Sequence, residues 1–193
     1  MAKTTTKSKL VHRSGAGKPP DFMAKLGRPK LIKKLPQLTV REIVAVTPIE
    51  TKTRSKDVRV RSIKRMAIPK SSFVEPDAVI YKVTCNNPEN RHDHDVTIII
   101  PDGREFSPSV KPRIDCSCPS FVFHSEYALA KRYGNAYIWR CNGQPPVETN
   151  PSLIGRGCKH TIAAFRALNN KKKEGKLPTR ITSLTSKISP VRD

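Results

Sequence analysis

The stretch CSCPSF, residues 116–121, places two of the five cysteines of this 193-residue chain one residue apart. A second short stretch, GCKH at residues 157–160, has a third cysteine separated from a histidine by a single residue. In an extended strand, residues i and i+2 project to the same side, so Cys116 and Cys118 at the end of a strand direct both sulfurs the same way. Each stretch therefore supplies a close pair of metal-ligating side chains.

The two pairs together predict one closed metal site. Structural Zn²⁺ takes four ligands, mainly thiolates and imidazoles, in a tetrahedron, and two of them often come as a close pair. The gap of 39 residues between the pairs implies an insertion inside the site, since the entropic cost of closing a loop rises only slowly with length. Four unrelated buried residues are the alternative, because free cysteine is often buried on packing grounds alone. The predicted ligands are Cys116, Cys118, Cys158 and His160, with Gly155 and Gly157 allowing a bend before the second pair.

The order Cys-x-Cys, variable stretch, Cys-x-His resembles the SWIM-type zinc finger, a small β-β-α unit. The resemblance covers roughly residues 78–170, and it implies that the same four residues bind one structural Zn²⁺. The spacer between the two pairs is longer than is common in this family. The wider pattern, CSCPSFVF then GQPPVETNPSL then GCKH, is similar to small SWIM-containing proteins carried in the virions of large tailed bacteriophages.

Strands are predicted ahead of the first cysteine pair. Residues 78–85 (AVIYKVTC) and 95–100 (DVTIII) are rich in β-branched residues, and PDG at 101–103 supplies the residues of a tight turn. A further extended stretch, residues 109–117, leads into the cysteines. Pro112 favours an edge position for it, because proline cannot donate to a strand ladder.

Helices are predicted after each pair. Apolar spacing favours a short amphipathic helix over residues 120–135 that ends on Gly134, and a helix with one buried face over residues 158–170. NAYIWRCNG, residues 135–143, indicates a further strand that closes on an Asn-Gly turn. The predicted fold class is α+β: a small zinc-stabilised β-β-α (SWIM-like) module with an inserted helix and strand, flanked by extended basic arms.

Other cysteine and histidine side chains are alternative ligands. Two single cysteines stand in strand-like apolar stretches, where ordinary burial is expected. The segment RHDHD, residues 91–95, can hold a metal, but its polar surroundings favour a solvated turn. These alternatives are Cys85 and Cys141, His92 and His94 beside Asp93 and Asp95, and His124, which either lies near the metal or faces solvent.

The formal net charge of +21 lies at the two ends of the chain. Residues 1–70 contain 19 Lys and Arg and 4 Asp and Glu, residues 71–168 contain 11 and 10, and residues 169–193 contain 7 and 2. A field of this sign attracts polyanions such as nucleic acid, acidic protein surfaces or anionic membranes.

The N-terminal region lacks sustained hydrophobic periodicity and is interrupted by Pro and Gly. One short apolar run, Leu38 to Glu50, could form a strand or a single helical turn when a partner surface fixes it. The predicted parts are a basic extended arm ordered by a partner (1–72), a SWIM-like zinc-binding domain (73–170) and a basic C-terminal tail (171–193).

The basic arm predicts contact with nucleic acid or with a protein partner. Gly-Arg-Pro at residues 27–29 matches the core of minor-groove hooks, but Leu26 stands where a basic residue is expected, so phosphate contact without base selectivity is predicted. A solvated tail and docking on an acidic protein surface are the alternatives. The candidate contact residues are Lys25, Arg28, Lys30, Lys33, Lys34, Arg59, Arg61, Lys64 and Arg65.

The pattern favours binding over catalysis. A hydrolytic zinc keeps one coordination position open, whereas four protein ligands fill the predicted site. We expect a non-enzymatic component of a large assembly, such as the head, neck or tail of a phage virion, that docks on neighbouring subunits or packaged DNA. A free DNA- or RNA-binding factor is the alternative. Without a membrane-spanning run or secretory signal, the expected location is the virion or host cytoplasm. We expect no membrane partner and no small-molecule substrate. An organellar transit peptide is a second interpretation of the basic start of the sequence.

Overall fold

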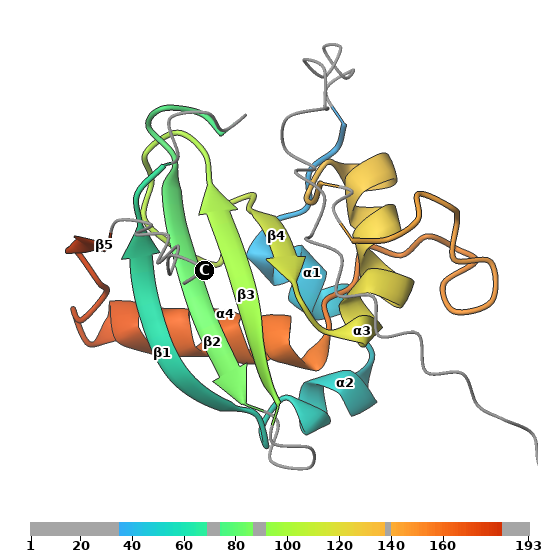
Figure 1. The fold of residues 1–193 in the computed structure, drawn as a ribbon, viewed down its shortest axis with the longest axis horizontal. Coiled ribbons are helices and arrows are strands. Elements are labelled where there is room, and N and C mark those ends of the chain that lie inside the picture. Colours follow the sequence, from blue (N-terminus) through green and yellow to red (C-terminus); the bar gives the residue numbers. More distant parts are fainter. Residues whose placement is uncertain (1–34, 69–73, 87–91, 138–139, 183–193) are drawn as a thin grey trace, which may run out of the picture. The chain divides into compact units, whose positions relative to one another are not determined.

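The computed structural model describes residues 35–68, 74–86, 92–137 and 140–182. All of them belong to the second of two units of the chain, Lys34–Asp193. This unit has a mixed α+β architecture, as predicted, in which helices pack on a five-stranded sheet (Figure 1).

The sheet has the strand order β4-β3-β2-β1-β5. Neighbouring strands from β4 to β1 are antiparallel, and β5 adds to β1 in parallel over two residues. The strands are β1 Arg59–Met66, β2 Val79–Asn86, β3 Asp93–Ile100, β4 Arg113–Cys116 and β5 Ile181–Thr182.

The two strands predicted ahead of the cysteines are confirmed as β2 and β3, which pair in register over their full lengths. The predicted turn follows β3, where Asp102 and Gly103 both adopt left-handed backbone angles, with φ of 65° and 62°. The next strand, β4, starts only at Arg113. It forms an edge of the sheet, as expected from Pro112.

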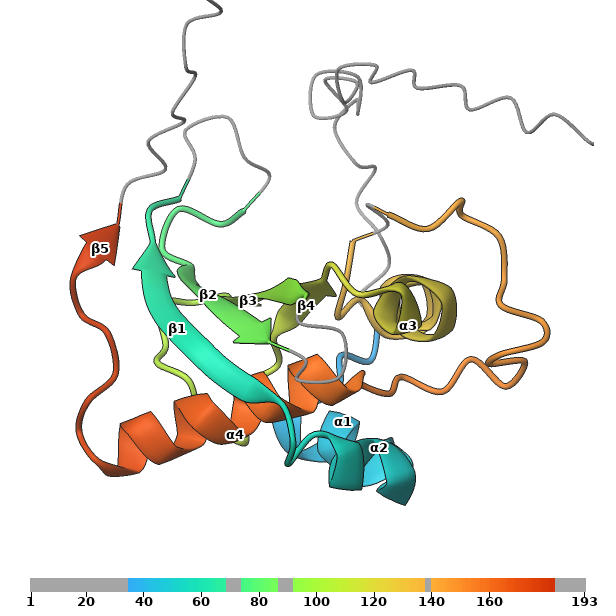
Figure 2. The ribbon, with the colours of Figure 1, turned by 60° about the horizontal axis from the view of Figure 1, so that its bottom comes forward.

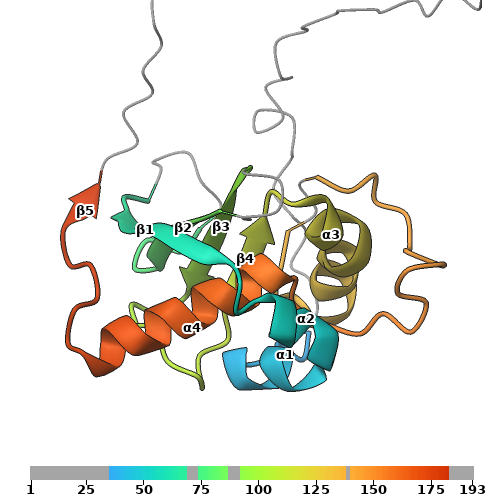
Figure 3. The same ribbon diagram turned by 90° about the horizontal axis from the view of Figure 1, so that it is seen from below.

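The helices lie on one face of the sheet and beyond its β4 edge. Figures 2 and 3 show α4 crossing beneath the strands, with α1 and α2 beside it, while α3 lies next to β4. The segment after α3 continues as two wider π-helical turns that end on Gly134, in the left-handed conformation. The helical bounds are α1 Val40–Val46, α2 Ile49–Arg54, α3 Pro119–Phe121, the π-helical turns Val122–Glu126 and Leu129–Tyr133, and α4 Lys159–Lys173.

The main core fills the space between the sheet and α4. Alternate residues of β2 and β3 project towards the helix, because side chains alternate across a strand. Tyr81 and Ile98 from the sheet and Phe165 and Leu168 from α4 are at most 3% exposed. A smaller apolar cluster around Ile80 and the neighbouring strand residues lies on the opposite face.

The structure differs from the predicted arm over residues 35–68, which fold into this unit. A capping box between Thr39 and Glu42 starts α1, and Ile43 of that helix is fully buried in the main core. β1 lies between β2 and β5. Basic residues occupy the outward positions of β1 and mask its weak apolar alternation in the sequence. The predicted boundary at residue 72 therefore does not coincide with the start of the fold.

The predicted strand over residues 135–143 is absent from its described residues, 135–137 and 140–143. The Asn135 side-chain amide donates to carbonyls outside this segment, those of Leu38 and Pro112, at 2.8 and 2.7 Å. At residues 140 and 141, a side chain takes the place of a strand partner. The buried Glu126 carboxylate accepts the backbone N–H groups of Arg140 and Cys141, at 2.8 and 2.9 Å.

The predicted C-terminal tail also begins inside the fold. α4 runs three residues past the predicted helix and ends on Lys173, and lysines suit this position because of the negative end of the helix dipole. The chain then turns at Gly175, whose φ is +67°, and returns to form β5. Residues 183–193 lie outside the described part.

Candidate metal centre

The four predicted ligands come together in the fold. The ligand atoms of Cys116, Cys118, Cys158 and His160 all lie within 4.8 Å of one another, and each side chain is buried. A tetrahedral metal with thiolate distances of about 2.3 Å places neighbouring sulfurs roughly 3.8 Å apart, so the cluster has suitable dimensions. The structure thus confirms a buried Cys₃His cluster that could hold one metal ion.

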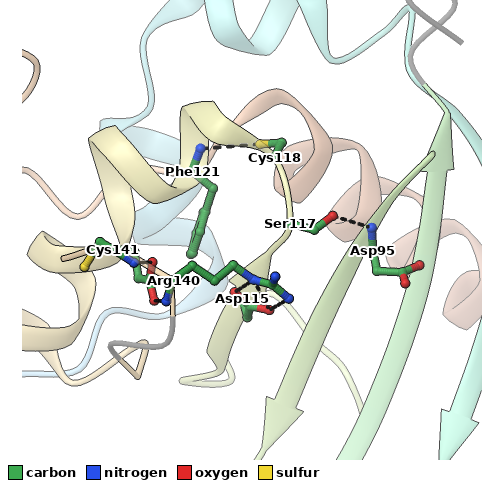
Figure 4. A network of polar contacts seen from close by, with 8 residues as sticks. Asp95, Asp115, Ser117, Cys118, Phe121, Arg140 and Cys141 are labelled. Atoms are coloured by element: carbon green, nitrogen blue, oxygen red, sulfur yellow. Dashed lines mark hydrogen bonds and ion pairs between the residues drawn. The ribbon is translucent and has the colours of Figure 1, made fainter. Parts of the chain in front are cut away.

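The first pair lies where β4 ends and α3 begins, and Figure 4 shows Ser117 and Cys118 at this point. Ser117, between the two cysteines, continues the sheet pairing: its N–H donates to the Asp95 carbonyl, and its hydroxyl accepts the Asp95 N–H, both at 3.0 Å. The Cys118 sulfur then caps α3 by accepting the N–H of Phe121 at 3.4 Å. Pro119 at the first helical position fits this turn, since proline needs no donor there.

The second pair is placed by the start of α4. Cys158 is the N-cap, and its sulfur accepts the Thr161 N–H at 3.4 Å and lies 3.2 Å from the Thr161 hydroxyl. The positive end of the 15-residue helix dipole stabilises a thiolate at this position. His160, in the first turn, projects into the same buried space.

The loop before Cys158 is fixed by the segment that was predicted to be an arm. The N–H of Gly157 donates to the Thr47 hydroxyl at 2.9 Å, and this hydroxyl donates to the Ile43 carbonyl at 2.7 Å. A side chain at Gly155 would place its Cβ 2.6 Å from Leu38. Close packing therefore requires Gly155, whereas the sequence prediction had attributed both glycines to a bend.

The donor chemistry fits a metal ion. Both ring nitrogens of His160 are buried and have no hydrogen-bond partner among the described residues. Burying an unpaired polar atom costs free energy, and a coordinate bond to one nitrogen would remove part of that cost. Three thiol groups beside an imidazole form a donor set that thiolate-binding metals prefer.

The three thiols of the cluster differ in how readily they lose a proton. Burial raises the pKa of Cys116 well above its ordinary value. The hydrogen bond with Cys116 lowers the pKa of Cys118, but the hydrogen bond with Cys158 and burial outweigh it and raise that pKa to about 12. Burial would also raise the pKa of Cys158, yet its contacts with Cys116, Cys118, His160 and Thr161 hold it well below the usual range. Of the three thiols, Cys158 is therefore the one that loses its proton most readily.

Two alternative ligands border the cluster without joining it. The Cys85 sulfur lies 3.8 Å from the backbone carbonyl of His160, and the His94 ring lies 4.5 Å from the His160 ring, centroid to centroid. Cys85 and His94 face each other across β2 and β3. Asp93 and His94 belong to β3, so the predicted solvated turn over residues 91–95 is wrong at these positions.

The remaining alternatives lie elsewhere. His124 faces Arg156, with 3.5 Å between its Nδ1 and the guanidinium, and Cys141 is partly exposed in the loop after the π-helical turns. Neither belongs to the four-residue cluster, and neither does His92.

Sequence reasoning missed the buried acid that supports the insertion beside the first pair. Glu126 is fully buried and accepts the two backbone N–H groups described above, while Arg140 forms an ion pair with the buried Asp115 at 3.2 Å (Figure 4). Asp115 directly precedes Cys116. The signal available in the sequence was that Glu126 is the lone acid among residues 116–147, which by itself does not indicate what it binds.

The structure describes only some of the residues that were predicted to contact a partner. Lys25, Arg28, Lys30, Lys33 and Lys34 lie outside the described residues. The other four, Arg59, Arg61, Lys64 and Arg65, lie on β1, where Arg61 is 3.4 Å from the carboxylate of Asp93.

Comparisons with protein-family models, curated proteins and solved structures find no match to this chain. Within the described ranges, none of the helices has the length and apolar run needed to cross a membrane.

Proposed function

We propose that this chain is a non-enzymatic protein in which one structural Zn²⁺, bound by Cys116, Cys118, Cys158 and His160, holds together a module that docks on a partner. The buried Cys₃His cluster carries this proposal. Four protein donors complete a tetrahedron, and zinc sites that activate water keep one position open for it.

The arrangement around the cluster supports a SWIM-like identity for the module. The Cys-x-Cys pair follows the antiparallel strands β3 and β4, and the Cys-x-His pair opens α4. This is the β-β-α order that the resemblance implies. The 39 intervening residues contain α3, the π-helical turns and a long loop.

The partner we propose is a large assembly, such as the head, neck or tail of a phage virion. The net charge of +21 and the basic residues 1–34 support docking on neighbouring subunits or on packaged DNA. A free DNA- or RNA-binding factor is the second candidate, favoured by the same charge.

Metal analysis combined with fractionation of native particles tests the proposal. We expect one zinc per chain and co-purification with particles through a high-salt wash. A protein found only as a free monomer, with salt-sensitive binding to nucleic acid, would favour the second candidate. A purified chain that takes up no zinc, cobalt or cadmium would contradict the metal site itself.

A further inference from the structure

A groove of about 410 Å³ lies between β1 and the C-terminal half of α4. Residues 60–63 of β1 form one wall, and residues spaced along one face of α4 form the other. Lys176 and Pro178, on the chain leading from α4 to β5, border the third side, and Figure 2 shows the course of this chain. The groove is remote from the metal centre, because it adjoins the end of α4 opposite Cys158.

The β1 wall of the groove is an open strand edge. β5 pairs with β1 only at Arg65 and Met66, so residues 59–64 have no strand partner on this side within the described part of the chain. The register with β2 shifts between Val60 and Ser62, which marks a bulge. Bulges and charged residues are features that prevent strand addition at sheet edges. An added peptide strand is therefore not the occupant that this edge favours.

Basic residues from distant parts of the sequence gather around the groove. Lys171 and Lys176 line it, and one carboxylate, Glu174, lies between them at 3.7 and 3.4 Å from their ammonium groups. The helix dipole explains lysines in the last turn of α4, but not those beyond it. Further cations without an ion-pair partner among the described residues, on the elements that border the groove, are Arg65 on β1, Lys172 and Lys173 on α4, and Arg180 before β5.

The opposite face of the sheet has a different charge pattern. Two of its cations are paired with carboxylates, Lys82 with Asp95 and Arg113 with Glu75, both at 2.8 Å, whereas Lys64, opposite Lys82 in the register, has no ion-pair partner among the described residues. Part of the charge on that face is thus neutralised. At the groove, one acid, Glu174, faces the three lining bases Arg61, Lys171 and Lys176.

We propose that this groove binds the phosphate backbone of a nucleic acid. Lysine ammonium groups act as point charges towards phosphate oxygens. The lining contains no aromatic side chain on which a base could stack, so the contact is independent of sequence. The inference rests on the proposed partner-binding function and deepens it, because it assigns phosphate recognition to the folded unit in addition to the basic residues 1–34.

Salt-dependent titration of duplex DNA with the zinc-loaded full chain tests the groove. The variant Lys171→Gln with Lys176→Gln removes two charges from it. If both lysines contact phosphates, the slope of log K against log salt becomes less steep by about 1.8. The control, Lys111→Gln with Lys131→Gln, removes two exposed charges beside β4, at the other edge of the sheet, and should leave the slope unchanged.

A single substitution in the groove should change the DNA affinity in the opposite direction. Glu174→Gln removes the one acid of the groove and should tighten DNA binding severalfold, whereas a purely structural Glu174 would give no gain. Equal slopes for wild type and the double variant, or an equal loss in the control, would overturn the proposal.

Lysine acetylation footprinting supplies a measurement that needs no variant. Duplex DNA should protect Lys171 and Lys176 but not Lys111 and Lys131. Protection by poly-glutamate and not by DNA would show that the groove takes an acidic protein segment, and would also overturn the proposal. Zinc content, measured on the same samples, separates a failed groove from a failed metal site.

Discussion

The backbone N–H of Gly157 donates to the side-chain oxygen of Thr47 across 2.9 Å, between residues that are 110 positions apart in the chain. Thr47 is 2% exposed and follows α1, and Gly157 directly precedes the metal-ligand candidate Cys158. The hydroxyl also donates to the carbonyl of Ile43, so it satisfies two buried backbone groups at once. The second ligand pair is therefore positioned by a segment outside the Cys-x-Cys to Cys-x-His span.

Thr47→Val should destabilise the metal-loaded protein by about 1–3 kcal/mol, because the Gly157 N–H and the Ile43 carbonyl remain buried while the hydroxyl between them is lost. Urea unfolding followed by circular dichroism measures the effect. Thr53→Val is the matched control, since Thr53 is exposed on α2; it should change stability by less than about 0.5 kcal/mol. Equal effects of the two variants would contradict the role assigned to Thr47.

Cys118→Ser should abolish metal binding and destabilise the fold by more than about 4 kcal/mol, because metal binding and folding are coupled in small sites. Cys141→Ser should keep one metal per chain and near-normal stability, since Cys141 lies outside the cluster. Metal analysis and thermal unfolding of both variants, with and without chelator, provide the measurement. Unchanged melting after chelation of the wild type would refute a structural metal.

Metal binding near pH 7 should release about two protons per ion. Cys116 and Cys118 have raised pKa values and enter the reaction protonated, while we expect Cys158, whose pKa is lowered, to be deprotonated already. The metal-free state holds more protons, so apparent affinity should rise about a hundredfold per pH unit. Calorimetry in buffers of different ionisation enthalpy measures the number released. Release of three protons would show that Cys158 is protonated as well.

His94→Ala should leave one metal per chain but accelerate its loss to a chelator. His94 contacts the His160 ring and is not one of the four clustered residues, so its removal opens space beside a ligand without removing a donor. Outer-shell changes at metal sites typically cost about 10–100-fold in affinity. Competition with a chromophoric chelator measures both quantities. A drop in metal content at saturating zinc would instead make His94 a ligand.

Local signals explain what could be predicted about the site. Two cysteines one residue apart at a strand end, and a cysteine and a histidine at a helix start, specify four donors by spacing alone. The strands β2 and β3 and the helix α4 were predictable because their apolar residues follow the period of each element. Residues 135–143 also have an apolar pattern, but the Glu126 carboxylate accepts the N–H groups of Arg140 and Cys141 that a strand partner would have paired.

The sequence by itself determined the four candidate ligands, the α+β class and the uneven distribution of charge. Tertiary structure alone decided that residues 35–68 belong to the fold. In the sequence they have the composition of a basic arm. Only the pairing of β1 with β2 and the burial of Ile43 in the core distinguish them from one. It also decided where the charge gathers. β1 and the end of α4 are more than 100 residues apart in the chain, and only their packing brings Arg65, Lys171 and Lys176 to one side of the sheet.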